Sequence, residues 1–444
     1  TEICQGTEIS STCYCNSGIK KGEREMVFKV DYVREQFPCL SKTVNGVPAA
    51  FLDGPGGTQV PRRVVDKINE YLYYHNANSH GQFITSVESD ALYWQARETL
   101  ADFLNCSPEE VAFGASTSTN NFLLAFGLLR SMKPGDEVIV TDIDHEGNRS
   151  PWRILEDFGI VVKSVRINIE DITLDFDDFM DKLSDKTKVV AINWAANSCG
   201  TVTDVKKYIA EAHKVGAVTV VDAVHYAPHK VIDVKDIDTD VLLCSAYKFF
   251  GPHLGVMYVH KRVGEKIKSI RVLANDNTEM PYKFETGTPA MELAAGAAEA
   301  VEFIADIGAV HMDQMEEKVK HLSGRRKNIV AGMLAIEEYE ENLAARLRRE
   351  LPKIPGLKVY GPAEGHQRTS TVSFTIDNVH SAEIGKFFAE RGLFVWDGDF
   401  YAIETINNVL KLEDKGGFVR IGLAPYNLQS EIDRVIEAVK DFVK

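Results

Sequence analysis

The chain has 444 residues and a formal net charge of −15, with 50 Lys and Arg against 65 Asp and Glu. At this length a chain can bury a large core, and two or three domains are expected. With 44% hydrophobic and 26% charged residues, the composition is that of an ordinary globular protein. The excess of acidic residues gives the protein no positive electrostatic potential that would attract phosphates, which argues against a general nucleic-acid binder. No apolar run is long enough to span a bilayer, so no membrane helix is predicted.

The cysteines are sparse and lack the paired C-x-x-C spacing of metal or redox motifs. They are Cys4, Cys13, Cys15, Cys39, Cys106, Cys199 and Cys244. Neither a disulfide framework nor a zinc site is expected, and a reducing cytoplasm is the predicted location. Residues 1–25 have no apolar segment typical of a secretory signal. We expect them to be a disordered or vector-derived tail, with Met26 as the natural initiator.

The first half of the chain predicts an α/β domain. Residues 27–60 predict a short helix and a loop, FLDGPGGTQVP, whose glycines indicate a tight turn rather than a P-loop. Residues 62–75 and 87–104 have the apolar spacing of helices. From about residue 109 to 260, short apolar strands alternate with helices. Such alternation predicts a largely parallel sheet, in which ligands bind beyond the carboxyl ends of the strands.

The second half predicts a smaller α+β domain. Long helices are expected at 290–306 and 315–351, and the second would connect two domains. Strand-like segments then alternate with helical stretches; they are LKVYG, TSTVSFTI, LFVWDGD and GFVRIGL. We therefore expect four parts, namely the tail 1–25, an N-terminal segment 26–60 associated with the small domain, a large domain 61–310, and a linker helix with the small domain over 311–444.

A lysine in an apolar, aromatic run is the first chemical signal. Lys248 lies in CSAYKFFGPHLGV, next to Tyr247 and Phe249. A single lysine at a strand end is most often a surface residue. Here, however, its neighbours would partly desolvate the amine and lower its pKa, as a lysine that forms a Schiff base requires.

Polar residues follow several other predicted strands. Asp222 ends AVTVVDA, where it is either a capping residue or a partner for the ring nitrogen of pyridoxal phosphate (PLP), whose protonated ring is the stronger electron sink. The run GASTSTNN, 114–121, opens a helix, and its hydroxyl and N–H groups suit a phosphate, although N-capping alone explains one of them. Ser245 and Tyr247 could supply further donors. His145 is either a turn histidine or a group that stacks on the pyridine ring.

Two further histidines, His225 and His229, have the i, i+4 spacing of a zinc pair. A zinc site would need a third ligand and an activating Glu, neither of which is evident in the sequence. No metal site is therefore predicted.

Taken in order, nine segments of residues 30–440 resemble the class V branch of fold type I PLP enzymes, and within it the cysteine desulfurase-like group. The segments are FLDGPGGTQ, NSHGQF, FGASTSTN, DIDHEGNRSPW, NSCGT, VDAVHYAPH, CSAYKFFGPHLGV, FETGTP and GFVRIGLAPYN. The resemblance implies a Schiff base between the cofactor and Lys248, a contact from Asp222 to the ring nitrogen, and His145 on the ring face. It also places Asn197 and His225 near the ring hydroxyl.

The resemblance implies further contacts beyond the ring. The phosphate would be held by Ser116, Thr117, Ser245 and Tyr247. Thr288, in FETGTP, would reach the phosphate of the neighbouring subunit, which implies a homodimer. Arg420, in FVRIGL, would bind the α-carboxylate of an amino-acid substrate, for which a planar guanidinium is suited; a structural arginine is the other interpretation.

One departure from the family is important. Cysteine desulfurases take sulfur onto a cysteine in a C-terminal loop, yet this chain has no cysteine after Cys244. The corresponding stretch is VWDGDFYAIE, with Tyr401 near the expected thiol position and Trp396 in place of the usual arginine. Cys199 lies near the predicted cofactor, but we expect it to be a small buried hydrophobe.

Three functions are compatible with these features. The first is a PLP-dependent lyase that cleaves a C–S or C–Se bond of cysteine or a related β-substituted amino acid without an enzyme persulfide. The second is an aminotransferase or epimerase of the same fold, because fold and cofactor do not fix the reaction. The third is an inactive scaffold or sulfur-assembly partner, against which the presence of Lys248, Asp222 and Arg420 in one chain argues.

Overall fold

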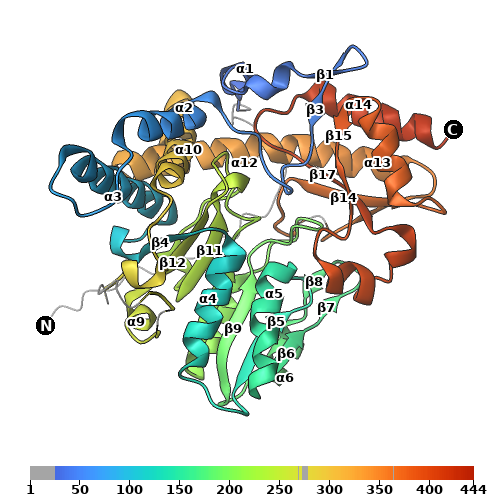
Figure 1. The fold of residues 1–444 in the computed structure, drawn as a ribbon. Helices are drawn as coiled ribbons and strands as arrows, with labels where there is room; N and C mark the ends of the chain where they lie inside the picture. Colours follow the sequence, from blue (N-terminus) through green and yellow to red (C-terminus); the bar gives the residue numbers. More distant parts are fainter. Residues whose placement is uncertain (1–25, 269, 273–278, 364) are drawn as a thin grey trace, which may run out of the picture.

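The computed structural model describes residues 26–268, 270–272, 279–363 and 365–444; the predicted tail, 1–25, lies outside them. Two sheets of different size are joined by a long helix, with flanking helices around both (Figure 1). This arrangement confirms the predicted α/β class with a large, mainly parallel sheet. Among the helices in the described ranges, none is long and apolar enough to cross a membrane.

The large sheet has seven strands in the order β4-β12-β11-β10-β9-β5-β6. Their bounds are β4 Val111–Gly114, β5 Glu137–Thr141, β6 Val161–Val165, β9 Thr187–Asn193, β10 Val218–Asp222, β11 Val241–Ser245 and β12 Gly255–Val259. All are parallel except β12, which runs antiparallel to both of its neighbours. β11 and β12 are buried throughout, as expected for strands covered on both faces.

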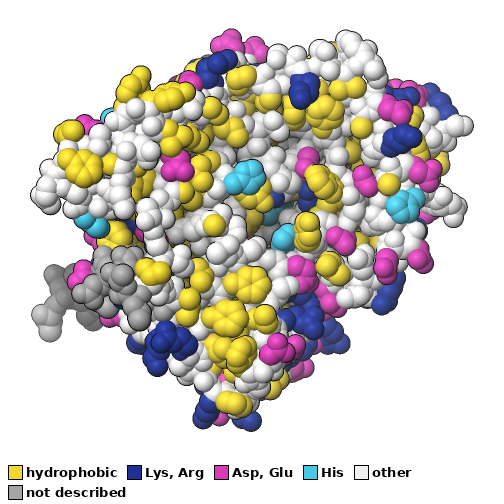
Figure 2. Space-filling model, viewed as in Figure 1, with side chains coloured by type: hydrophobic (Ala, Val, Ile, Leu, Met, Phe, Trp, Pro, Cys, Tyr) yellow, Lys and Arg dark blue, Asp and Glu magenta, His cyan; other side chains and the backbone are white. Residues whose placement is uncertain are grey.

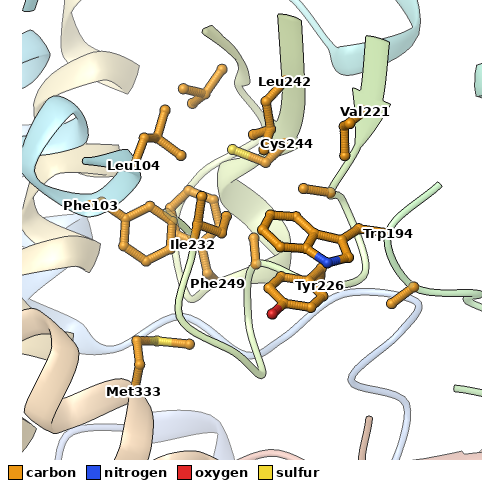
Figure 3. Packing of buried hydrophobic residues seen from close by; sticks show 14 of the residues in the cluster. Phe103, Leu104, Trp194, Val221, Tyr226, Ile232, Leu242, Cys244, Phe249 and Met333 are labelled. Carbon is orange, nitrogen blue, oxygen red and sulfur yellow. The ribbon is translucent and has the colours of Figure 1, made fainter. Parts of the chain in front are cut away.

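Alternate residues of these strands enter two different cores, because successive side chains point to opposite faces. On one face, Val138 and Val140 pack with residues of α4 (Thr117–Leu129) and α5 (Glu146–Arg153). On the other face, Val221 and Leu242 join a core that includes α7 (Val205–Lys214), α10 (Met291–Val310) and the long helix α12 (Gly324–Glu350). Figure 3 shows part of this second core, with the Trp194 and Tyr226 rings stacked at a centroid distance of 3.8 Å.

The small sheet is antiparallel, in the order β13-β14-β17-β16. Its strands are β13 Leu357–Tyr360, β14 Thr371–Ile376, β16 Trp396–Gly398 and β17 Phe418–Gly422. Residues of this sheet form a separate core with α13 (Ser381–Ala389), α14 (Gln429–Phe442) and the end of α12. The N-terminal strand β3 (Ala50–Phe51) pairs in parallel with β15 (Leu393–Phe394) beside this sheet. The boundaries proposed for the domains stay a prediction.

The remaining elements are short or cover the large sheet from outside. The helices are α1 Val30–Arg34, α2 Arg62–Glu70, α3 Ile84–Leu104, α6 Phe176–Lys182, α8 Val234–Ile237, α9 Lys261–Gly264 and α11 Met312–Val319. The strands are β1 Thr43–Val44, β2 Val47–Pro48, β7 Ile167–Asn168 and β8 Thr173–Leu174. Of these, α2 and α3 pack against α10.

Two predicted elements are interrupted. The single helix expected over 315–351 is split into α11 and α12, because the chain turns after Val319 and Gly324 adopts a left-handed φ of +59°. The segment LFVWDGD is not one strand either. Its first part, β15, pairs with β3, whereas its second part, β16, pairs with β17.

Candidate active site

A cavity of about 750 Å³ lies where the large sheet meets the small one. The last residues of three neighbouring strands line it: Asn193 of β9, Asp222 of β10 and Ser245 of β11. Parallel strands bring such residues to one edge of a sheet, which is where α/β sheets bind ligands. Arg420 of β17 lines the cavity from the small sheet. In the space-filling view, histidine side chains are visible near the centre of this face, between the two sheets (Figure 2).

Lys248 lies in this cavity at the end of a short 3-10 helix that follows β11. Its neighbours Phe249 and Phe250 are fully buried, and Lys248 itself is only 8% exposed. Its amine donates a hydrogen bond to the carbonyl of Pro55. Burial, and then the nearby Arg420, lower the pKa of Lys248 to about 7, although carboxylates partly oppose the shift. A large fraction of this amine is therefore neutral near neutral pH, as the sequence predicted from its neighbours.

Asp222 and His145 line the same cavity, and the environment shifts the pKa of both. Burial raises the pKa of Asp222 to about 6, while its Oδ1 accepts a hydrogen bond of 2.9 Å from the N–H of Val224. Burial, and then the nearby Lys248 and Arg420, lower the pKa of His145 to about 4. His145 Nδ1 caps α5 by accepting the Gly147 N–H at 2.8 Å. His145 is thus both a turn residue and a neutral ring in the cavity.

Hydroxyl groups gather where α4 begins. Ser116 is the N-cap of α4, and its Oγ accepts an N–H of the first turn at 3.1 Å. The Thr117 hydroxyl donates to the carbonyl of Cys244 at 2.9 Å and is also hydrogen-bonded to Ser245 Oγ. The cavity is lined by Ser116, Thr117, Ser245 and Tyr247. Together with the helix N-terminus, they form an environment suited to an anion.

Arg420 is 2% exposed and held by two groups. It donates to Asp53 Oδ1 at 2.8 Å and to the backbone carbonyl of Asn197 at 3.1 Å, and its guanidinium lies 4.0 Å from the centre of the Phe400 ring. Burial lowers the pKa of Arg420. The sequence does not indicate the Asp53 contact, since the glycines of FLDGPGG predict only a turn.

Comparisons with known proteins identify the family. The model of the family described as "Aminotransferase class-V" matches residues 50–326 and 327–435, which is most of the chain. The chain belongs to the class V aminotransferase family. A "Probable cysteine desulfurase" from Synechocystis is 30% identical over 428 residues, covering 93% of this chain and 95% of that protein. "Aminotransferase-like protein FGM3" from Gibberella zeae is also 30% identical, over 427 residues, with 93% and 98% coverage.

A solved structure agrees with this assignment. The apo structure of a cysteine desulfurase from Thermococcus onnurineus matches with a TM-score of 0.80 and 25% identity, covering 93% of this chain and 98% of that one. The chain is therefore a cysteine desulfurase-like, PLP-dependent enzyme of fold type I. These matches confirm the predicted family, fold and cofactor.

The cavity fits PLP by its own chemistry. It combines the low-pKa amine of Lys248, the carboxyl of Asp222 and an anion-binding helix N-terminus. Two of its polar atoms, His225 Nδ1 and Asn197 Oδ1, are buried without a hydrogen-bond partner in the described part of the chain. Buried polar atoms are normally satisfied, so these two are the positions at which polar atoms of a ligand are expected. The roles of the individual residues stay predictions.

The segment around Tyr401 forms one wall of the cavity. Trp396 and Tyr401 both line it, and the Tyr401 and His145 ring centres are 5.4 Å apart. Phe400 and Tyr401 have left-handed φ angles of +56° and +59°, an uncommon conformation for non-glycine residues. The carbonyl of Tyr401 accepts the Glu146 N–H at 2.8 Å, which ties this segment to α5.

Two residues that the sequence placed near the cofactor, Thr288 and Cys199, lie outside this cavity. Thr288 is exposed and does not line it, so its predicted contact with a neighbouring subunit has no test in a single chain. Cys199 is fully buried, its Sγ is 3.3 Å from the Thr201 hydroxyl, and it does not line the cavity. No cysteine is among the described residues that line the cavity.

Proposed function

We propose that this enzyme is a PLP-dependent lyase that eliminates the β-substituent of cysteine or a related amino acid and forms no persulfide on its own chain. The observation that carries the proposal is the composition of the cavity wall. Tyr401 lines the cavity in the segment where the family's sulfur-accepting cysteine is expected, and the chain has no cysteine after Cys244. A phenol cannot hold sulfur as a persulfide, whereas the lysine and arginine needed for amino-acid chemistry face the same space.

Each of four residues of the cavity would have its own role in such a reaction. Arg420 would bind the α-carboxylate, since its guanidinium is buried and oriented by Asp53. Lys248 would take the Cα proton, because its pKa of about 7 leaves a neutral amine to act as base. Asp222 would contact the ring nitrogen and His145 the ring face. When bound, PLP supplies the electron sink that stabilises negative charge at Cα.

The proposed elimination balances without an oxidant or reductant. The electron pair of the Cα–H bond forms the Cα–Cβ double bond, and the Cβ–S pair leaves with the thiolate. The released enamine takes up water and yields pyruvate and ammonium. Sulfur leaves the cavity as sulfide or a small thiol, so the chain itself needs no acceptor.

A second function is supported by one comparison. The relative named "Aminotransferase-like protein FGM3" is as similar to this chain as the relative named "Probable cysteine desulfurase". Transamination or epimerisation would use the same lysine and the same carboxylate-binding arginine. It would differ in the carbon that is reprotonated.

The products of a substrate panel separate these functions. The holoenzyme is incubated with L-cysteine, S-alkylcysteines, L-selenocysteine and L-alanine, and sulfide or selenide, pyruvate, keto acid and racemised amino acid are measured. The lyase proposal predicts equal amounts of pyruvate and of the released sulfide, selenide or thiol from the three β-substituted amino acids, none from L-alanine, and no need for a keto acid as co-substrate. Keto-acid-dependent amino transfer, or racemisation without loss of the β-substituent, would contradict it.

A further inference from the structure

Two neighbouring histidines of the loop after β10 are held by different kinds of partner. The His225 and His229 rings are both buried, and their centres lie 5.1 Å apart. His229 Nδ1 lies 2.7 Å from a carboxylate oxygen of Glu340 on α12, and the Ser370 hydroxyl donates to the same oxygen at 2.9 Å. His225 Nε2 instead lies 3.0 Å from each of two hydroxyls, those of Thr369 and Thr371.

The kind of partner determines the charge that a buried imidazole can carry. A carboxylate stabilises the imidazolium, whereas a hydroxyl hydrogen-bonds equally well to the neutral ring. Burial, and then the nearby His229, Arg420 and Lys248, lower the pKa of His225 well below its ordinary value. With hydroxyl partners alone, His225 is neutral.

The same hydroxyls decide which ring nitrogen faces the cavity. His225 lines the cavity, but Thr369 and Thr371 do not. Since Nε2 is turned toward these two threonines, Nδ1 is the nitrogen left for a ligand, and it is buried without a partner among the described residues. An unsatisfied nitrogen in a ligand cavity is the position at which a polar ligand atom is expected.

We propose that Thr369 and Thr371 are positioning residues, which orient His225 and keep it neutral so that its Nδ1 hydrogen-bonds to an oxygen of the bound cofactor ring. This proposal rests on the placement of PLP in this cavity and not on the reaction that follows.

His225, Thr369 and Thr371 are all buried, and the residues next to them are packed. Tyr226, the next residue after His225, stacks on Trp194 with an interplanar angle of 8° (Figure 3). The threonines belong to the segment that leads into β14, whose Ser373 is paired in register with Arg420. Thr371, the first residue of β14, and Arg420 of β17 therefore belong to one sheet, and Thr369 lies two residues before that strand.

The test compares a variant without the hydroxyls with one that restores them. Thr369→Val/Thr371→Val removes both hydroxyls at nearly constant volume, and Thr369→Ser/Thr371→Ser keeps them. Thr375→Val is a matched control, since Thr375 lies on the same strand and is hydrogen-bonded to Tyr360 instead. The readouts are the PLP dissociation constant by equilibrium dialysis and the pH titration of the visible absorbance of the substrate-free holoenzyme.

The double valine variant is expected to bind PLP about tenfold more weakly, the effect of losing one buried hydrogen bond. The midpoint of its absorbance titration should also move by more than about half a pH unit. The double serine variant and Thr375→Val should match the wild type in both readouts. Should the double variant fail to fold, Thr371→Val and Thr371→Ser are compared alone.

Wild-type affinity and an unchanged midpoint in a folded valine variant would overturn the proposal. So would a serine variant as impaired as the valine one, because the effect would then follow from packing. Neither readout uses a substrate. A failure of the lyase proposal therefore shows only in the product panel and is distinguishable from a failure of this one.

Discussion

The rate at which PLP attaches to Lys248 should depend on pH, and the midpoint of that dependence should be set by the burial of the amine. Only the neutral amine attacks the aldehyde of the cofactor. With a pKa of about 7 in place of 10.5, roughly three quarters of the amine is neutral at about pH 7.5, against about one part in a thousand for an ordinary lysine. The second-order rate of attachment should rise about tenfold per pH unit below pH 7 and become constant above it.

Stopped-flow absorbance after mixing apoprotein with PLP measures this rate directly. Nα-acetyllysine amide in the same buffers corrects for the titration of PLP itself. The variant Arg420→Gln should shift the midpoint of this pH dependence in a direction that the structure defines. Arg420 contributes to the lowered pKa of Lys248, and its loss also leaves the Asp53 carboxylate unpaired, so the midpoint should move to higher pH. A wild-type rate that keeps rising tenfold per pH unit through about pH 9 would mean that the pKa of Lys248 is not lowered.

Three further predictions concern single features of the site. Lys248→Ala should give a colourless protein without a borohydride-fixed cofactor, and peptide mapping of reduced PLP to another lysine would contradict the assignment. Arg420→Lys should lower kcat/KM ten- to a hundredfold, mainly through KM, since the loss of a charged, bidentate contact costs about 1.5–3 kcal/mol; an unchanged KM would exclude carboxylate binding there. Because Thr288 is predicted to serve the opposite subunit, full activity should require a homodimer, and light scattering that finds a fully active monomer would be incompatible with it.

The part of the site that the sequence predicted is the part encoded locally. Asp222 and Ser245 end apolar strands, and Ser116 opens a helix, so their arrival at one edge of the sheet follows from the parallel topology. The aromatic neighbours of Lys248 likewise indicated its lowered pKa. In each case a short segment contains both the residue and the reason for its position.

Contacts between distant segments could not be predicted in the same way. Asp53 and Arg420 are 367 residues apart, and His225 and Thr369 are 144 apart. The sequence pattern of a segment predicts its own secondary structure but not how the two sheets lie against each other. It therefore cannot indicate which polar side chains from the two sheets will be in contact. The division of the helix expected over 315–351 also depends on one left-handed residue, Gly324, within an otherwise helical composition.

Intact-protein mass spectrometry during turnover tests the central proposal most directly. The holoenzyme is mixed with excess L-cysteine in the absence of reductant, quenched with acid after a few turnovers, and measured alongside a variant with four cysteines replaced, namely Cys39, Cys106, Cys199 and Cys244. We expect the wild-type chain to keep its unmodified mass while sulfide accumulates, and the variant to retain most of its activity per bound cofactor. A stoichiometric species heavier by one sulfur atom and mapped to Cys199, together with loss of sulfide release in Cys199→Ala, would contradict it.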